Sequence, residues 1–336
     1  MRIEMNIHKH RRYVLLSLTS LMLTGKVIAQ TATPNPAQTY PIKLIRIVVP
    51  FPPGGPTDLY ARIIGQKLQE TWGQPTLVDN RPGGTGTVGT GLVQQSAPDG
   101  YTLLFTSNSA HVISPLLREP RPFDPVRNFS PITLAVRYPM YVLLHPSVPA
   151  RSVAELITLA RAKPGQLNYS SVGIGSGGHL ACELFNLAAG TRIVHIPFKG
   201  AAPAQTALVS GETQMMCDSV GNSQALVDKG KLRGVAVTGA ARSPAVPQVP
   251  TLKESTLPVE AYIWLGLLGP AGMSAALVNQ LNMEVVRIMN LPDVRERVVK
   301  GGSDVIANTP DQFSNEMRAE TATWARVIKE KGIKAE

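Results

Sequence analysis

Short apolar runs alternate with glycine-rich turns and amphipathic stretches along the first third of the chain. The β-branched run 44–49 (LIRIVV) predicts a buried strand, which stops at the proline- and glycine-rich segment 50–56. A helix is expected to begin at Thr57 or Asp58 and to close at Gly73. Further strands are expected at 76–79 and 101–106, with a helix to about residue 97 between them. Strand, loop, helix and strand in this order are typical of a parallel sheet.

The same order restarts after residue 140. Ser152 and Glu155 form a capping box that predicts a helix to about Lys163. We expect strands at 167–171, 193–196, 214–217 and 231–238, and helices from the 173–179 loop through 187 and at 201–209. The last third is predicted to be mostly helical, and Thr309 and Pro310 mark the start of a long final helix. Two βαβ units with a helical return predict an α/β protein with two lobes, between which the chain crosses more than once.

The first 29 residues have the order of a secretory signal peptide. A basic stretch ending at Arg12 precedes the apolar run 13–23, and Val27 and Ala29 occupy the −3 and −1 positions of a cleavage site. The run is shorter than the ~20 residues that a bilayer core requires. We therefore predict a signal peptide over 1–29, cleavage near Ala29, and export of a soluble protein to the periplasm, with a flexible leader over 30–40.

Composition narrows the class of protein. Hydrophobic residues make up 43% of the chain and charged residues 17%, which excludes global disorder. The net charge is +10, but no block of basic residues follows the signal peptide, so a nucleic-acid partner is not expected. The two cysteines, Cys182 and Cys217, lie in no metal-binding motif, and no metal is expected. Whether they form a disulfide or stay as buried thiols is left open by the sequence.

Three loops that follow strands and precede helices are candidates for binding: 50–58, 106–111 and 173–179. Ligands of open α/β sheets bind outside the carboxyl ends of the strands. There the free N–H groups of a helix's first turn, together with the helix dipole, attract an anion. Glycines in such loops let a ligand approach the backbone. The pattern predicts an anion-binding site.

Two other kinds of chemistry fit less well. Residues 84–89 match the dinucleotide fingerprint G-x-G-x-x-G, but no carboxylate follows about 20 residues later, so no nucleotide cofactor is expected. Ser176 lacks the glycine two places earlier that a nucleophile elbow requires, and no third group accompanies His179. We interpret these two residues as polar groups that face a bound ligand, and Asp58 and Asp218 as residues that fix loops and helix ends.

Nine segments, taken together, resemble one family in sequence and spacing. The chain from about 40 to 333 is similar to the Bug (Bordetella uptake gene) family, the periplasmic receptors of tripartite tricarboxylate transporters. The segments are 41–62, 78–89 (VDNRPGGTGTVG), 97–104, 123–133, 173–185 (GIGSGGHLACELF), 194–204 (VHIPFKGAAPA), 231–252, 266–272 and 309–320.

The resemblance implies a two-lobe periplasmic binding protein, a type II Venus flytrap in which each lobe is a mainly parallel sheet flanked by helices. We assign 41–140 and 255–336 to lobe 1 and 141–254 to lobe 2. A small carboxylate is expected in the cleft, held by backbone amides of the 50–58 loop, with ordered waters bridging it to lobe 1. The residues expected to bind it are Phe51, Gly54, Gly55, Pro56, Thr57, Asp58, Ser107, Asn108, Ser109, Gly175, Ser176, Gly177, His179 and Asp218. Phe198 departs from the family, since a tyrosine is commoner there.

The function implied is capture and delivery rather than catalysis. The ligand is expected to be a small organic acid, such as a di- or tricarboxylate, an acidic amino acid or an aromatic acid. The partners are expected to be the membrane subunits of the transporter, and the receptor itself is expected to be a monomer without cofactors. Two alternatives stay open: a ligand-sensing receptor for a sensor kinase, and a hydrolase that uses Ser176, His179 or Asp218.

Overall fold

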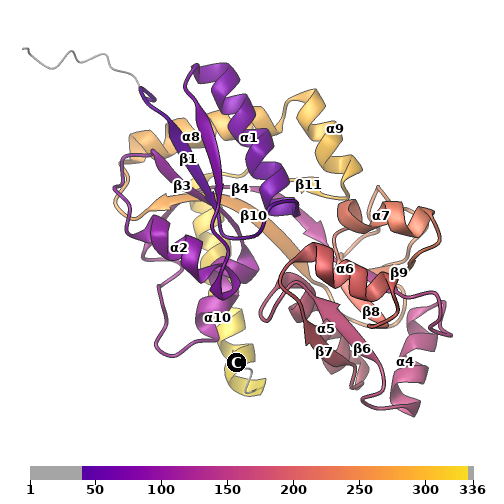
Figure 1. The fold of residues 1–336 in the computed structure, drawn as a ribbon. Coiled ribbons are helices and arrows are strands. Elements are labelled where there is room, and N and C mark those ends of the chain that lie inside the picture. The colour runs from indigo at the N-terminus through magenta and orange to yellow at the C-terminus, as the bar shows by residue number, and fades with distance from the viewer. Residues whose placement is uncertain (1–39, 332–336) are drawn as a thin grey trace, which may run out of the picture. The chain divides into compact units, whose positions relative to one another are not determined.

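Buried apolar strands form two β-sheets, and the helices that connect these strands flank each sheet (Figure 1). The computed structural model describes residues 40–331, so the predicted signal peptide and nearly all of the predicted leader lie outside the described residues. The fold reported below lies in the unit that begins at Pro41. No helix among residues 40–331 combines the length and the apolar character that crossing a bilayer requires.

The first sheet has six strands in the order β11-β4-β10-β3-β1-β2. Its strands are β1 (Ile45–Val49), β2 (Thr76–Asn80), β3 (Thr102–Ser107), β4 (Phe129–Pro139), β10 (Tyr262–Pro270) and β11 (Asp304–Val305). The helices of this lobe are α1 (Pro56–Trp72), η1 (Gly84–Gly86), α2 (Thr87–Gln94), η2 (Ser109–Ile113), α3 (Ser114–Leu116), α8 (Ala275–Met289), α9 (Pro292–Lys300) and α10 (Pro310–Lys331). Helices α1 and α8 lie side by side on one face of the sheet, and α2 and α10 cover the other (Figure 1).

The second sheet has five strands in the order β7-β6-β8-β5-β9. Its strands are β5 (Tyr141–Leu144), β6 (Asn168–Ser171), β7 (Val194–Pro197), β8 (Met215–Asp218) and β9 (Arg233–Val237). The helices of this lobe are α4 (Val153–Ala162), α5 (Gly177–Ala189), α6 (Ala201–Val209) and α7 (Val220–Asp228). The two-lobe α/β fold predicted from the sequence is confirmed.

Both sheets are mixed, so the expectation of mainly parallel sheets was wrong. β1 pairs in parallel with β2 and β3, but β10 runs antiparallel to both β3 and β4. In the second sheet β5 runs antiparallel to β8 and β9. The antiparallel pairs arise because β4 leaves the first sheet, β5 enters the second, and β10 brings the chain back. These three strands were not predicted.

Each lobe has its own apolar core. Fully buried Val48, Leu104 and Leu134 of the first sheet pack with Phe313 of α10. In the second lobe, a separate cluster joins strand residues to α6 and α7, including Tyr141, Leu143, Leu208, Met216 and Val237. Strands covered on both faces are buried almost along their whole length, which explains their continuous apolar runs.

Two chain segments join the lobes side by side. β4 and β5 are separated by Met140 alone, and the return strand β10 begins just after Ala261. Thr238 links all of these segments: its backbone N–H donates to Met140 O (2.8 Å), and its hydroxyl donates to Ala261 O (2.6 Å). Its hydroxyl oxygen also accepts from Met140 N (2.8 Å). The segments that connect the two lobes are therefore held together by hydrogen bonds.

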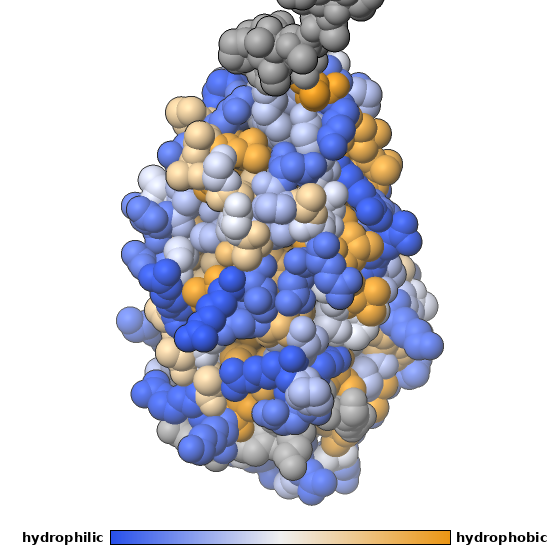
Figure 2. Space-filling model, turned by 90° about the vertical axis from the view of Figure 1, so that its left-hand side faces the viewer, coloured by the Kyte–Doolittle hydropathy of each residue, from blue (hydrophilic) through white to orange (hydrophobic). Residues whose placement is uncertain are grey.

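The outer surface is mostly polar on the face seen in Figure 2, where hydrophobic side chains form small separate groups rather than one broad patch. Among the large apolar side chains that are exposed, Leu59, Leu77 and Met283 lie on different elements. Single exposed apolar residues are normal for a water-facing protein.

Candidate functional site

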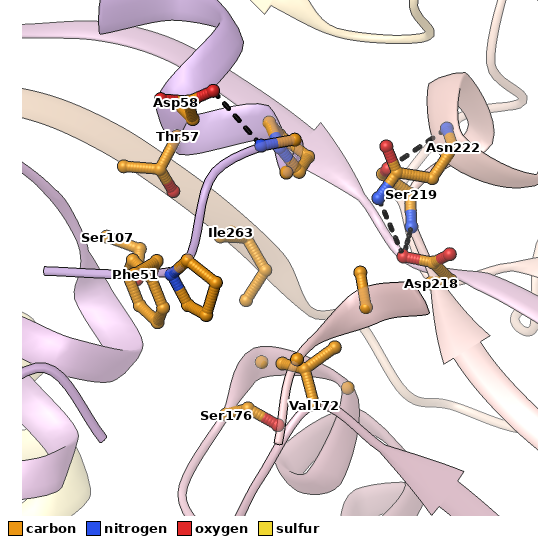
Figure 3. A pocket seen from close by; sticks show the side chains of 18 of the residues that line it. Phe51, Thr57, Asp58, Ser107, Val172, Ser176, Asp218, Ser219, Asn222 and Ile263 are labelled. Atoms are coloured by element: carbon orange, nitrogen blue, oxygen red, sulfur yellow. Dashed lines mark hydrogen bonds between the residues drawn. The ribbon is translucent and has the colours of Figure 1, made fainter. Parts of the chain in front are cut away.

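A cavity of about 640 Å³ lies between the two lobes and is lined by loops from both (Figure 3). All but three of the predicted ligand-binding residues line it. Those that do are Phe51, Gly54, Gly55, Pro56, Thr57, Asp58, Ser107, Ser109, Ser176, Gly177 and Asp218. The cavity is large enough for a small organic ligand.

Four helices begin at this cavity. The residues that line it there are 55–58 at the start of α1, 176–178 of α5, 200–203 of α6, and Ser219, Gly221 and Asn222 of α7. The N–H groups of a helix's first turn have no carbonyl one turn earlier to donate to, and the helix dipole places partial positive charge there. Four such ends around one cavity form a site for an anion that needs no cationic side chain.

Two of these helix ends are left without a side-chain cap. The N-caps of α1 and α6 are glycines, Gly55 and Gly200, so no side chain competes with a ligand for the first N–H groups. α5 and α7 are capped by Ser176 and Ser219, whose hydroxyl oxygens accept from the backbone N–H of the third helical residue. A serine that accepts in this way still has its own proton to donate to a ligand.

Asp58 organises the 51–58 loop. Its carboxylate accepts from Gly54 N (3.0 Å) and from Asn80 Nδ2 (3.0 Å), and Asn80 also donates to Phe51 O (3.1 Å). Arg62 forms an ion pair with the same carboxylate (Nη2 to Oδ1, 2.9 Å). Burial alone would raise the pKa of Asp58, but the hydrogen bonds from Arg62, Gly54 and Asn80 outweigh it and keep the pKa below its ordinary value. Asp58 is thus ionised and already paired.

Asp218 ends β8 and connects two helix ends (Figure 3). Its carboxylate accepts from Gln205 Nε2 on α6 (2.8 Å) and from Ser223 Oγ on α7 (2.7 Å). It also accepts from the backbone N–H of Ser219 (2.8 Å) and from Asn222 Nδ2 (3.4 Å). Burial raises the pKa of Asp218, and these hydrogen bonds offset part of that effect.

The remaining wall is largely apolar. Phe51 and Ile263 face the cavity with Val172, and Tyr138 and Met140 complete it. In Figure 3, Ile263 lies between the side of Phe51 and Thr57 and the side of Asp218 and Asn222. Ser107 and Ser109 add hydroxyls on the lobe 1 side, with their Oγ atoms 2.8 Å apart.

Sequence reasoning missed the residues that come from unpredicted elements. Tyr138, Met140 and Ile263 lie on or beside β4 and β10, which were not expected. The α6 and α7 ends were missed as well: Lys199, Gly200, Ala201, Ala202, Pro203, Gln205, Ser219, Gly221 and Asn222. The signal for α6 was present in the GAAPA run at 200–204, where glycine precedes a predicted helix as it does at Gly55.

Three predicted residues lie behind the cavity wall. Asn108 donates to Glu320 Oε1 (2.8 Å) and to Tyr262 O (3.1 Å). His179 Nδ1 accepts from Gly175 N (3.0 Å), so these two residues hold the 173–177 loop in shape. The structure therefore places Asn108, Gly175 and His179 where they support the wall.

His179 belongs to a stack of three rings, in which His179 and Tyr169 are buried and His195 is half-buried. Its ring centroid lies 4.1 Å from that of His195, which stacks in turn on Tyr169. Burial lowers the pKa of His179, so the ring is neutral and can accept at Nδ1. The hydrogen bond between Ser176 and His179 uses the backbone N–H of His179 rather than its ring. The pair is therefore not arranged as nucleophile and base.

The two cysteines lie next to each other, and one of them lines the cavity. Cys182 and Cys217 are free buried thiols whose Sγ atoms are 2.9 Å apart, and Cys217 lines the cavity. Burial raises the pKa of the Cys182 thiol, which makes it a poor nucleophile. Among the residues that the structure describes, no group of three or more His, Cys, Asp or Glu side chains is placed to hold a metal ion.

Comparison with known proteins gives consistent matches over nearly the whole chain. Residues 60–333 match the sequence model of a family described as "Tripartite tricarboxylate transporter family receptor". A UPF0065 protein from the tcbD-tcbE intergenic region of Pseudomonas sp. strain P51 is 34% identical over 320 residues, which is 94% of this chain and 95% of that protein. Protein BugT of Bordetella pertussis is 34% identical over 327 residues, covering 95% of this chain and 99% of BugT.

Solved structures show the same architecture. Rpa4515 of R. palustris, solved with adipate, superposes with a TM-score of 0.83 at 32% identity and covers 88% of this chain and 99% of its own. MatC of Rhodopseudomonas palustris, with bound malate, superposes with a TM-score of 0.80 at 31% identity, and the match covers 86% of this chain and 100% of MatC. The periplasmic binding protein BugD superposes with a TM-score of 0.82 at 30% identity, and the match covers 88% of this chain and 100% of BugD.

Proposed function

Since the chain belongs to the family of tripartite tricarboxylate transporter receptors, we propose that it captures a small organic carboxylate in the cavity between its lobes and delivers it to the membrane subunits of such a transporter. It is a periplasmic solute-binding protein of this family and not an enzyme, as its relatives are receptors. Two structural neighbours were solved with carboxylates, adipate and malate.

The observation that carries the proposal is the meeting of four helix N-termini at one cavity. A carboxylate placed there accepts from backbone N–H groups of α1 and from the opposing lobe at the same time. A ligand held by both lobes binds the closed arrangement better than an open one, and so shifts the population toward closure. A receptor needs this behaviour so that its transporter can distinguish the ligand-bound form from the ligand-free form.

The proposal includes the assignments drawn from the sequence. Lobe 1 comprises 41–140 and 255–336, and lobe 2 comprises 141–254. We assign the direct ligand contacts to the 51–58 loop, Ser107, Ser109 and the α5 end, and also to the α6 and α7 ends, because these line the same cavity. The receptor acts as a monomer.

Gly55 offers the cleanest test of the site. A Cβ at Gly55 meets no heavy atom within 4 Å, and its φ of −88° is open to any residue. Gly54 is less suitable because its φ is +92°, and a side chain at Gly177 would lie 2.3 Å from Ile263 Cδ1. Gly55→Val therefore adds a branched side chain at the cavity without straining the fold.

We expect small organic acids to stabilise the wild type in a thermal-shift screen and to bind in calorimetry. A ligand at a hundredfold excess over Kd adds about 2.7 kcal/mol of stability. Gly55→Val should lose this shift, because the side chain keeps the carboxylate away from the α1 amides. Gly91→Ala is the matched control: Gly91 is a helical glycine outside the cavity with open space around it. Equal shifts from acids and their neutral amides, or full binding by Gly55→Val, would place the site elsewhere.

A further inference from the structure

We propose that the cavity selects ligands with two anionic groups and no ammonium group, and that Lys199 and Asp218 set this preference. Lys199 is the cation that the second anionic group meets, and Asp218 is closed to the ligand. The inference rests on the proposed function, and it narrows the ligand class that the sequence left open.

Among the described residues, three charged side chains line the cavity: Asp58, Lys199 and Asp218. Asp58 is compensated by Arg62, whose Nη2 lies 2.9 Å from Oδ1. Lys199 is exposed, and within residues 40–331 no carboxylate lies at ion-pair distance from its ammonium group. It is the one Lys or Arg among the described residues that line the cavity. Asp218 has no cationic partner within 40–331 either, but it is buried and its oxygens accept hydrogen bonds from neutral protein donors. Among the described residues that line the cavity, exposed Lys199 is therefore the charged group that is open to pairing with a ligand.

Both carboxylates of the cavity have their acceptor sites filled by the protein. A carboxylate offers about four lone-pair sites on its two oxygens. Asp218 Oδ1 accepts from Ser219 N (2.8 Å) and Asn222 Nδ2 (3.4 Å), and Oδ2 accepts from Gln205 Nε2 (2.8 Å) and Ser223 Oγ (2.7 Å).

Asp58 is filled in the same way. Its Oδ2 accepts from Gly54 N (3.0 Å) and Arg62 Nε (3.1 Å), while Oδ1 accepts from Asn80 Nδ2 (3.0 Å) and pairs with Arg62 Nη2 (2.9 Å). A ligand ammonium would lose its hydration without gaining a carboxylate partner, and it would lie near four positive helix ends. Amino acids are therefore disfavoured.

The distribution of donors fits a ligand with two anionic ends. The α1 end and Ser107 form one pole on lobe 1, and Lys199 with the uncapped α6 end forms another on lobe 2. Apolar Phe51, Ile263 and Val172 line the cavity as well, and Ile263 lies between the two sides in Figure 3. A hydrocarbon spacer between two carboxylates matches this order of polar, apolar and polar wall.

Matched ligands test the preference by calorimetry. The probes are glutarate against glutamate and adipate against 2-aminoadipate, which differ by the ammonium group, and adipate against its monoamide, which differs by one charge. We expect the wild type to bind each plain diacid at least tenfold more tightly than its amino partner or its monoamide. Equal affinities within both kinds of pair would overturn the inference.

Lys199→Gln should weaken the binding of adipate about tenfold and leave the affinity for the monoamide nearly unchanged, so that the two affinities converge. Lys253→Gln is the control, because Lys253 is exposed on the same lobe and lies outside the cavity lining. A parallel loss for both probes in Lys199→Gln would contradict a charge-specific role.

Gln205→Ala tests the closed carboxylate by gain of function. Gln205 lines the cavity and covers Asp218 Oδ2, so its removal opens an acceptor toward the ligand. The ratio of the adipate affinity to the 2-aminoadipate affinity should then fall at least threefold. Unchanged discrimination would show that Asp218 does not set it. Failure of any acid to bind the wild type would instead defeat the proposed function, which keeps the two outcomes distinct.

Discussion

At the scale of single residues, His111 shows how burial is turned into a pH response. The side chain is fully buried, its Nε2 donates to Pro125 O (2.8 Å), and its ring packs edge-on against Phe129 at 4.6 Å between centroids. Burial lowers the pKa of His111 from 6.5 to about 4, although Pro125 and Asp124 oppose the shift. The native state therefore resists protonation of a group that the unfolded chain protonates readily.

The sign of the stability effect follows from these two values. Above pH 6.5 the ring is neutral in both states, and as the pH falls toward about 4 the unfolded state gains a proton that the native state refuses. The free energy of unfolding should fall over this window by up to about 3 kcal/mol from this residue. His111→Gln should lose that part of the slope, as measured by urea unfolding at pH 7, 6, 5 and 4. The same slope in both proteins would count against this account.

Residues also show the limits of sequence reasoning. Asp58 was predicted to fix its loop, because a lone acid at such a position more often caps a helix or fixes a loop than takes part in acid–base chemistry. Its hydrogen bonds are those of such a residue. Lys199 was not singled out, since a lone lysine in a sequence is usually a solvated side chain. Its proposed role depends on the absence, among residues 40–331, of a carboxylate at ion-pair distance, and that is a property of three-dimensional packing.

At the scale of elements, a turn of lobe 1 meets a loop of lobe 2. Thr85 in η1 donates from Oγ1 to Ile174 O at 2.6 Å. Its φ is +53°, a conformation that a β-branched residue adopts at a cost. Strain of this kind at a contact between lobes is typical of a residue placed for function. We interpret Thr85 as a latch, that is, a residue whose hydrogen bond holds the two lobes in the arrangement described here.

Thr85→Val should weaken ligand binding about two- to tenfold, because one net hydrogen bond is worth about 0.5–1.5 kcal/mol. The ranking of ligands should not change, since the latch does not contact the ligand cavity. Thr87→Val is the control: its hydroxyl bonds Gly84 O within the same turn (3.0 Å) and not the other lobe. Calorimetry should measure the ligand affinity of both variants. Identical affinities would contradict the role proposed for Thr85.

Helices were easier to predict than the strands that cross between lobes. The helix predicted at 201–209 coincides with α6, because its glycine entry and small residues give a clear local pattern. β4 and β5 were missed because Met140 alone separates them, so no turn marks the passage between sheets. β10 contains Gly266, Gly269 and Pro270, residues that usually mark turns.

At the scale of the whole molecule, the predicted route to the periplasm has a simple test. The signal peptide lies outside the described residues, and its cleavage near Ala29 is our prediction from the order of basic, apolar and small residues. The intact mass of the protein recovered from a periplasmic extract should correspond to a chain that starts near Gln30. A product that keeps Met1, or one that stays in the membrane after a salt wash, would contradict it.

The two-lobe fold could be predicted because each lobe repeats a βαβ unit and the segments resemble one family. The meeting of α1, α5, α6 and α7 at one cavity could not, because it depends on how two sheets face one another. A local sequence pattern records that a helix begins, but the direction in which its first turn points is set by the rest of the fold.

Recognition by backbone N–H groups has an evolutionary consequence. In the proposed binding mode, backbone N–H groups at the α1 and α6 ends hold a carboxylate. Most substitutions replace a side chain and leave these groups in place, except at glycines such as Gly55. In the same binding mode, the spacer and the second anionic group of the ligand contact side chains, among them Phe51, Ile263 and Lys199, which line the cavity. Ligand specificity in such receptors can therefore change through single substitutions of side chains, while the ability of the backbone to bind a carboxylate is retained.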